Sequence, residues 1–396
     1  MNKRTFLRNA AGLFFAPLAG RLLAAPAAGK SRFLLVFLRG GYDAANVLIP
    51  VSSGFYYESR PNIAVARESA LPLTSEWGLH PALGDTVYKL YQNGQAAFIP
   101  FAGTEDLSRS HFETQDAIEL GQGAEGAHNF QSGFLNRLAS VLGASEAVLR
   151  PRAMAFTDQL PLVFRGEAQV ANMGLKFVGK PAVDARQSAL IAAMYRGTPL
   201  AAQVNEGFAM RDDVMRDMMG EMEGAGRNAV SARGFEVEAR RVAKLMKEQF
   251  NVGFVDVGGW DTHVGEGGAS GFLATRLEEL GGGLAAFADE QGPAWQDTVV
   301  VLISEFGRTF RENGNRGTDH GHGTVFWVLG GGIRGGRIAG DQVPVREETL
   351  FQNRDYAVLN EYRGVLGGLF ARMYGLEDAQ LERIFPGAKA RDFALV

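Results

Sequence analysis

Near-continuous apolar runs constrain the fold of this chain more than any other feature of its sequence. Residues 33–38 read FLLVFL and residues 299–303 read VVVLI, and neither run alternates between apolar and polar side chains. A strand covered on both faces has this pattern, whereas a strand with one face in water alternates. The two runs therefore predict inner strands of a parallel sheet.

Further strands and helices alternate along the chain. Strands are expected at 96–103, at 252–257 and in the stretch TVFWVLGGG that begins at Thr324, and helices at 83–93, 240–250 and 270–291. This alternation indicates an α/β fold with a mostly parallel sheet and helices on both faces. The sequence has no repeat of fixed period. Residues 28–396 are expected to form a single α/β domain.

A helical, methionine-rich insertion is expected between about Asp184 and Gln249. The composition there shifts toward Ala, Met, Arg and Glu at helical spacing, which predicts two or three helices that cap the sheet. Packing explains the clustered methionines more simply than a ligand groove does. These methionines are Met210, Met215, Met218, Met219 and Met222.

The first 27 residues have the features of an export signal. A basic start precedes a weakly apolar run and small residues that suit a signal peptidase, so cleavage is expected near Ala27. The stretch from Lys3 to Arg8 resembles a twin-arginine leader, which implies the twin-arginine translocase as a partner during export and a periplasmic or secreted protein. Arg21 interrupts the apolar run before it reaches the roughly 20 residues of a membrane span. The alternative is an amphipathic first helix of the mature fold.

Charge and cysteine content exclude several classes of function. The formal net charge is -4 and the pI about 6.0, so nucleic acid is not an expected partner. The chain has no cysteine, which removes disulfides, thiolate zinc sites and cysteine nucleophiles. Any chemistry must therefore use oxygen and imidazole groups.

Acidic and imidazole side chains lie next to the ends of four expected strands. They are Asp43, then Asp261 with His263, then Glu305, then Asp319, His320 and His322 in the stretch RGTDHGHGT. Open α/β sheets place their ligands beyond the carboxyl ends of the strands, so we expect these side chains to share one edge. Carboxylate with imidazole suits Zn²⁺, Mn²⁺ or Fe, and the number of groups fits one or two ions.

Two of these carboxylates also have simple structural explanations. Asp43 alone fits a turn or a helix cap. Glu305 could instead pair with Arg308 or Arg311.

The histidine-containing stretches are more specific. Asp261 and His263 are alternate residues of an extended segment, so their side chains point to the same side and can hold one ion. The glycines around His320 and His322 permit a tight turn and remove competing bulk. The remaining histidines His80 and His128 are expected to be structural.

The stretch EDLSRSHFE, residues 105–113, offers a nucleophile at the start of an expected helix. Backbone N–H groups and the helix dipole stabilise an anion there. An alkoxide of Ser110 could attack phosphorus in line, with Arg109 neutralising the developing charge and His111 as a further catalytic candidate. The alternative is that Ser110 only caps the helix.

Together these motifs resemble the alkaline phosphatase and sulfatase superfamily, and in particular a branch of exported bacterial proteins with twin-arginine leaders. The resemblance covers nearly all of the mature chain through FLRGGYDAANVLIP, SRSHFETQD, GGWDTH, SEFGRT and TDHGHG. It implies an alkaline-phosphatase-like fold that holds two metal ions. It also implies roles for five residues: Asp43 as first ligand, Asp261 and His263 as the middle pair, His322 as the last histidine and Ser110 as nucleophile.

The chain departs from the superfamily pattern in two places. Where the superfamily has a later Asp-His pair, this chain has Glu305 and Phe306, and a phenylalanine cannot bind a metal. Either Asp319 and His320 compensate or one metal site is lost. The Cys/Ser-x-Pro-x-Arg signature of sulfatases is absent, which argues against sulfate ester cleavage by the usual route.

The sequence therefore predicts a secreted, metal-dependent hydrolase or transferase that uses Zn or Mn. Its substrate would be a phosphate or related anionic ester carried by a small molecule, a glycan or a lipid. The alternative is an exported binding or assembly protein that keeps the fold and one metal ion without turnover, because one fold hosts many functions.

Overall fold

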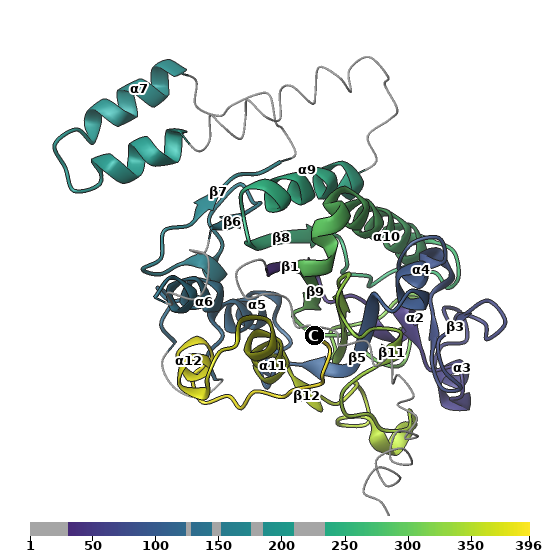
Figure 1. The fold of residues 1–396 in the computed structure, drawn as a ribbon. Coiled ribbons are helices and arrows are strands. Elements are labelled where there is room, and N and C mark those ends of the chain that lie inside the picture. Colours follow the sequence, from purple (N-terminus) through teal and green to yellow (C-terminus); the bar gives the residue numbers. More distant parts are fainter. Residues whose placement is uncertain (1–30, 124–127, 145–151, 176–184, 210–233) are drawn as a thin grey trace, which may run out of the picture.

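The computed structural model describes residues 31–123, 128–144, 152–175, 185–209 and 234–396. The expected export signal at 1–27 and the five clustered methionines lie outside the described residues. The described helices and strands form layers, with a central sheet between helices (Figure 1).

Within the described residues, the central sheet has nine strands. Their order is β11-β5-β10-β9-β1-β8-β6-β7, and β12 pairs with β5. The bounds are β1 Arg32–Arg39, β5 Ala96–Gly103, β6 Ala153–Ala155, β7 Ala171–Asn172, β8 Val252–Gly258, β9 Thr298–Ser304, β10 Thr324–Leu329, β11 Arg337–Ile338 and β12 Asn360–Glu361. A smaller sheet contains β2 Leu48–Ile49, β4 Gly78–Leu79 and β3 Leu71–Pro72 in that order.

Helices cover both faces of the central sheet. One face packs against α4 Val87–Gln92, α9 Gly234–Glu248 and α10 Phe272–Gln291. The other packs against α5 His111–Leu120, α6 Phe134–Gly143, α11 Tyr362–Tyr374 and α12 Asp378–Ile384. Further helices are α2 Ala44–Val47, α3 Gly54–Ser59 and α7 Ala185–Met194, and residues 201–209 are also helical. Short 3-10 turns lie at Pro81–Leu83, Leu162–Phe164, Gly292–Asp297 and Glu347–Thr349.

The central strand β1 explains why the first apolar run does not alternate. Leu34, Val36 and Leu38 enter the core on one face, and Phe33, Leu35 and Phe37 enter the core on the other. All six side chains are at most 2% exposed. The expected α/β fold, with a mostly parallel sheet covered on both faces, is confirmed.

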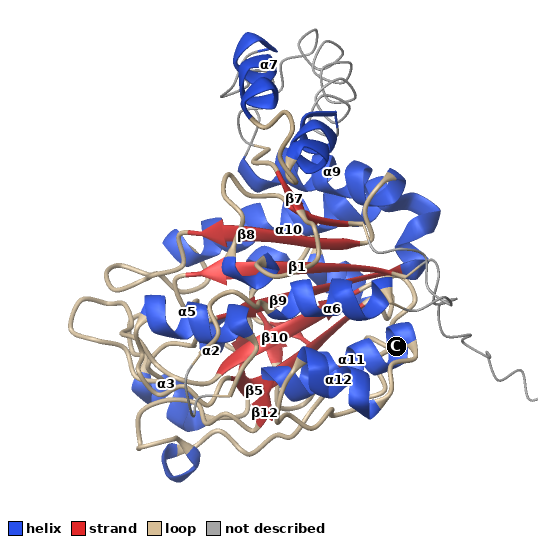
Figure 2. Ribbon diagram, turned by 90° about the vertical axis from the view of Figure 1, so that its left-hand side faces the viewer, coloured by secondary structure: helices blue, strands red, loops and turns tan. Residues whose placement is uncertain are grey.

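The sheet departs from a fully parallel arrangement at β10. β1 pairs in parallel with β8 and β9 (Figure 2), whereas β10 is antiparallel to both β9 and β5. The first residue of β10, Thr324, therefore lies at the edge where the other strands end. The loop at 305–323, which carries RGTDHGHGT, returns to that same edge.

Two expected helical segments differ in detail. The helix expected at 83–93 is divided into the 3-10 turn Pro81–Leu83 and α4. Within the range expected to form an insertion, α9 packs beside the sheet as part of the core, whereas α7 exposes Leu190 and Met194. None of the helices in the described ranges combines the length and the apolarity that crossing a membrane requires.

Candidate metal centre

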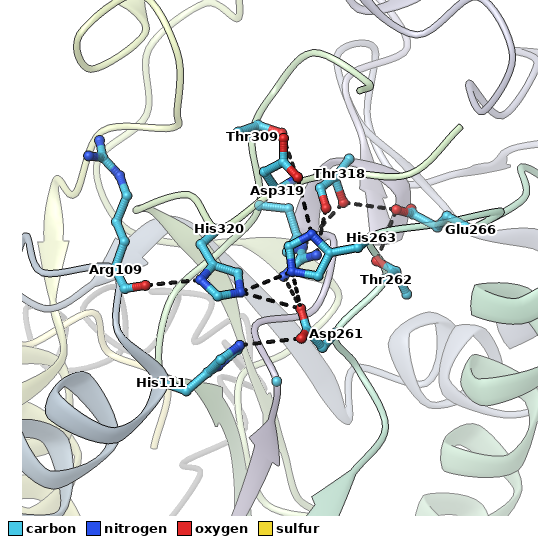
Figure 3. Close-up of polar contacts among 12 residues, drawn as sticks. Arg109, His111, Asp261, Thr262, His263, Glu266, Thr309, Thr318, Asp319 and His320 are labelled. Carbon is cyan, nitrogen blue, oxygen red and sulfur yellow. Dashed lines mark hydrogen bonds and ion pairs between the residues drawn. The ribbon is translucent and has the colours of Figure 1, made fainter. Parts of the chain in front are cut away.

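Three histidines and one aspartate meet at the carboxyl edge of the sheet (Figure 3). They come from three segments that follow strands, and one of these segments supplies two of the four residues. His111 begins α5 after β5, Asp261 and His263 follow β8, and His320 lies in the loop between β9 and β10. The structure thus brings together Asp261, His263 and His320 of the expected ligand set, and His111, expected as a catalytic residue, lies with them.

Each of the three imidazole rings is held through its Nδ1 atom. Nδ1 of His111 lies 2.7 Å from Oε1 of Glu305, and Nδ1 of His263 lies 3.1 Å from Oδ1 of Asp319. Nδ1 of His320 lies 3.0 Å from the backbone oxygen of Arg109. A carboxylate or carbonyl oxygen only accepts, so in a neutral ring Nδ1 carries the proton and Nε2 keeps its lone pair.

The three Nε2 atoms face a common point beside Asp261. Nε2 of His263 lies 3.1 Å from Nε2 of His320 and 3.0 Å from Oδ1 of Asp261. Nε2 of His320 lies 3.5 Å from Oδ1, and Nε2 of His111 lies 3.6 Å from Oδ2. Lone pairs and a carboxylate at these distances repel one another unless a proton or a cation lies between them.

The donor set fits a divalent metal ion. Nε2 of His111 is buried and has no hydrogen-bond partner among the described residues. Donor atoms of His111, Asp261 and His320 lie within 4.8 Å of one another. Ligands about 2.1 Å from a tetrahedral ion are about 3.4 Å apart, so small side-chain movements would close this geometry. Imidazole with carboxylate suits zinc and similar ions.

Glu305 supports His111 from behind. Its side chain is fully buried and accepts hydrogen bonds from His111, from Nε2 of Gln115 at 2.9 Å and from the backbone N–H of Gly40 at 2.8 Å. The hydrogen bond to Glu305 raises the pKa of His111. Burial opposes ionisation of Glu305, but the hydrogen bonds from His111 and Gln115 hold its pKa below the ordinary value. Glu305, expected as a metal ligand with an arginine pair as the alternative, instead forms a carboxylate–imidazole pair with His111, which is typical of metal-site histidines.

Asp261 is kept ionised by a buried arginine. Nη1 of Arg308 donates to Oδ1 of Asp261 at 2.6 Å, and the Arg308 side chain is inaccessible to solvent. Partial burial would raise the pKa of Asp261, but the hydrogen bond and charge of Arg308 lower it overall. Oδ2 is the oxygen that faces His111.

Two glycines of the RGTDHGHGT stretch allow this loop to pack against its neighbours. A Cβ on Gly317 would lie 2.4 Å from the backbone carbon of His263, and one on Gly321 would lie 2.4 Å from the backbone carbon of Arg308. Real Cβ atoms do not approach backbone this closely, so both positions require glycine. The expected role of these glycines in removing bulk is seen in these contacts.

Asp43 lies in a separate buried network. Both of its carboxylate oxygens accept from the guanidinium of Arg60, and Oδ1 also accepts from the N–H of Ala45 at the start of α2. Burial opposes ionisation of Asp43, but the charge of Arg60 keeps its pKa low. Burial and the nearby Asp43 raise the pKa of Glu266 well above its ordinary value. The structure therefore gives Asp43 the capping role considered for it, and its oxygens are taken by an arginine.

Three other expected site residues lie beside the cluster without joining it. The ring of His322 packs against Phe351 with centroids 5.0 Å apart, and burial lowers its pKa to about 4. Ser110 is the N-cap residue of α5, although its side chain makes no capping hydrogen bond. The guanidinium of Arg109 binds Asp355 and points away from His320, while its backbone oxygen faces that ring (Figure 3).

The cluster is open on one side. Side-chain exposure reaches 44% for Asp261, 40% for His263 and 53% for Asp319, against 23% for His111 and 28% for His320. On the closed side, the ring of Phe306 lies 4.9 Å from that of His111 and 5.1 Å from that of His320. Phe306 thus forms an apolar wall of the site beside these two imidazole rings.

Sequence reasoning missed Arg60, Glu266 and Asp355. All three are charged residues with buried side chains. Arg60 donates to Asp43, Glu266 accepts from Thr318, and Asp355 accepts from Arg109. No spacing rule connects Asp355 with Arg109, which lies 246 positions away. The local sequence around these three positions has no pattern that marks them.

Over residues 30–385 the sequence matches the model of a family described as "Protein of unknown function (DUF1501)", and the chain belongs to this family. No curated protein matches it. Among solved structures, a protein in the alkaline phosphatase superfamily from Vibrio parahaemolyticus is similar, with 12% identity, a TM-score of 0.34 and coverage of 77% of this chain. This chain spans 62% of the length of that protein. Ps i-CgsB in complex with k-i-k-neocarrahexaose is similar at 9% identity and a TM-score of 0.37, covering 89% of this chain and 74% of that one.

Proposed function

We propose that this member of the DUF1501 family binds one divalent ion, Zn²⁺ or Mn²⁺, and acts as a hydrolase or transferase on phosphate or related anionic esters. His111, Asp261 and His320 would hold the ion, with His263 within reach as a fourth ligand. The observation that carries the proposal is the convergence of three Nε2 lone pairs on one carboxylate. A divalent ion bound there would act as a Lewis acid toward an ester oxygen.

The residues of the chain orient the site and set its charge. Glu305, Asp319 and the carbonyl of Arg109 each hold one imidazole through Nδ1, which aims Nε2 at the ligand position. Arg308 keeps Asp261 ionised, and its own charge offsets part of the attraction for a cation. The exposed side formed by Asp261, His263 and Asp319 leaves room for substrate to approach.

Exposed apolar residues that lie close to site residues in the sequence support a substrate with an apolar part. Phe112 follows His111 and is 83% exposed, Val264 follows His263 and is 70% exposed, and Leu107 in the preceding loop is 50% exposed. We expect Phe112→Ser to lower kcat/KM for an aryl or long-chain acyl phosphate ester several-fold and to leave a small alkyl phosphate unchanged. Equal loss for both esters would exclude this role.

A second candidate function is binding without turnover. It is supported by the absence of any hydrogen bond between the Ser110 hydroxyl and the cluster within the described residues, and by the engagement of the Arg109 guanidinium with Asp355. Under this alternative the protein would take up one metal ion and bind anionic ligands without cleaving them.

Elemental analysis of the purified protein tests the metal site first. We expect about one equivalent of Zn or Mn in the wild type and loss of that metal in His111→Gln and His320→Gln, with His128→Gln as the matched control. Metal-free wild-type protein that does not take up Zn²⁺ or Mn²⁺ would exclude the metal site. Screening the loaded protein with phosphomonoesters and phosphodiesters then separates turnover from binding.

Export through the twin-arginine route belongs to the same proposal. Folded proteins use this route, which suits an enzyme that binds its metal before it leaves the cytoplasm. Replacing Lys3 and Arg4 by glutamine should retain the protein in the cytoplasmic fraction, and unchanged export would contradict the assignment.

A further inference from the structure

His320 is anchored at two points, and both anchors lead to the same carboxylate. Its ring donates from Nδ1 to the backbone oxygen of Arg109 at 3.0 Å, and its own backbone oxygen accepts from Nη2 of Arg354 at 2.8 Å. Both arginines bind Asp355. Nε and Nη2 of Arg109 lie 3.1 and 2.7 Å from Oδ2, and Nη1 of Arg354 lies 3.1 Å from Oδ2 and 3.2 Å from Oδ1.

Asp355 is held in place by its surroundings and bonds both arginines. Its side chain is inaccessible to solvent, and its backbone pairs with Thr309 and Phe351 in isolated β-bridges. A buried carboxylate that accepts from two guanidinium groups costs several kcal/mol to leave without a partner, so its arginines are held firmly.

The backbone of Arg109 adopts a conformation that is unfavourable for a residue with a Cβ. Its backbone φ is +53°, a left-handed conformation that costs a residue with a Cβ about 1 kcal/mol. This conformation turns the carbonyl oxygen toward Nδ1 of His320. The hydrogen bonds from the guanidinium to Asp355 and to Oε1 of Gln352 at 2.8 Å supply the compensation.

We propose that Asp355 is a positioning residue that aims Nε2 of His320 at the ligand position through Arg109 and Arg354. Through Arg109 it fixes the backbone oxygen of that residue, which accepts from Nδ1 of His320 and so selects the Nδ1-protonated tautomer. Through Arg354 it holds the backbone oxygen of His320. The consequence for metal binding rests on the metal site proposed above, whereas the control of the ring does not.

The test compares Asp355→Asn with Asp392→Asn, a matched variant of an exposed carboxylate that binds Arg372 far from the site. Long-range ¹H–¹⁵N spectra of metal-free protein report the tautomer of each of the six histidines. We expect Asp355→Asn to shift the His320 signals from the Nδ1-protonated form toward an average of both forms, and to weaken Zn²⁺ binding about 10- to 100-fold. Asp392→Asn should change neither.

A second pair of variants separates positioning from a general loss of stability. Glycine adopts positive φ without strain, so Arg109→Gly should keep more of the Nδ1-protonated form of His320, and tighter Zn²⁺ binding, than Arg109→Ala. Equal behaviour of the two variants would contradict the role of the carbonyl, and this comparison holds even if Asp355→Asn does not fold.

The outcomes for the two proposals are distinguishable. Wild-type His320 tautomer and Zn²⁺ affinity in folded Asp355→Asn would overturn the positioning role and leave the metal site standing. A wild-type protein that binds no metal would remove the proposed function, while the tautomer shift in Asp355→Asn would still decide the positioning role.

Discussion

At the scale of single residues, Asp261 is the residue that we expect to control binding of the proposed cation. All three Nε2 atoms face its carboxylate, and Arg308 keeps it ionised. Without its charge the three imidazoles would remain oriented, because their Nδ1 partners are elsewhere.

We therefore expect Asp261→Asn to weaken Zn²⁺ affinity by more than about 100-fold, since loss of an outer partner alone costs about 10- to 100-fold. Competition with a chromogenic chelator measures the dissociation constant. Asp289→Asn, an exposed position on α10, is the control. An affinity within a few fold of the wild type would show that Asp261 is not a ligand.

His322 gives a second prediction at this scale. Burial depresses its folded-state pKa to about 4, below an unfolded value of about 6.5. The unfolded chain then binds the proton more readily, so this histidine destabilises the fold as pH falls from about 6.5 to about 4, by roughly 3 kcal/mol in total. Above pH 6.5 its contribution is constant.

Urea denaturation at a series of pH values checks this sign. Between pH 7 and pH 4.5 the free energy of unfolding should fall less for His322→Gln than for the wild type. Each protein is compared with its own value at pH 7.5. Parallel pH curves for the two proteins would show that His322 titrates normally.

At the scale of elements, the antiparallel direction of β10 creates the site. It returns the loop at 305–323 to the carboxyl edge, and the glycines of that loop fit against the backbones of His263 and Arg308. Close backbone contacts at these glycines, as well as the contacts of His320, therefore position the loop.

Gly321→Ala tests this close packing. The added Cβ would meet backbone atoms of Arg308 at 2.4 Å, so we expect a loss of roughly 1 to 3 kcal/mol in the free energy of unfolding and weaker metal binding. Gly314→Ala in the same loop is the control, because its Cβ would meet nothing within 4 Å. Thermal or urea unfolding of both variants gives the comparison.

At the scale of the whole molecule, the proposed ligands come from three loops, so an ion bound there would link these loops across the edge of the sheet. An ion that binds only the folded state stabilises it by about 2.7 kcal/mol at 100 times its dissociation constant. Chelation should therefore lower Tm by several degrees, and adding Zn²⁺ or Mn²⁺ should restore it.

The same titration with Asp261→Asn provides the control, because a variant without the site should show no response. A wild-type Tm that is indifferent to chelator and to added metal would argue against a bound ion in the native protein.

The sequence by itself determined the inner strands and the residues beside their ends. Runs such as FLLVFL are buried on both faces wherever they lie, so local composition suffices to recognise them. Asp261, His263 and His320 were selected from the sequence because they combine a carboxylate with imidazoles next to strand ends, where open α/β sheets place their ligands.

Only the tertiary structure decided which of these side chains meet. An apolar run reads the same for either strand direction, so the reversal of β10 could not be predicted from TVFWVL. The pairing of Asp43 with Arg60 and the link from Asp355 to His320 depend on tertiary contacts, and those of the second link join segments more than 200 positions apart. Such contacts are set by packing of the whole sheet and leave no periodic signal in the chain.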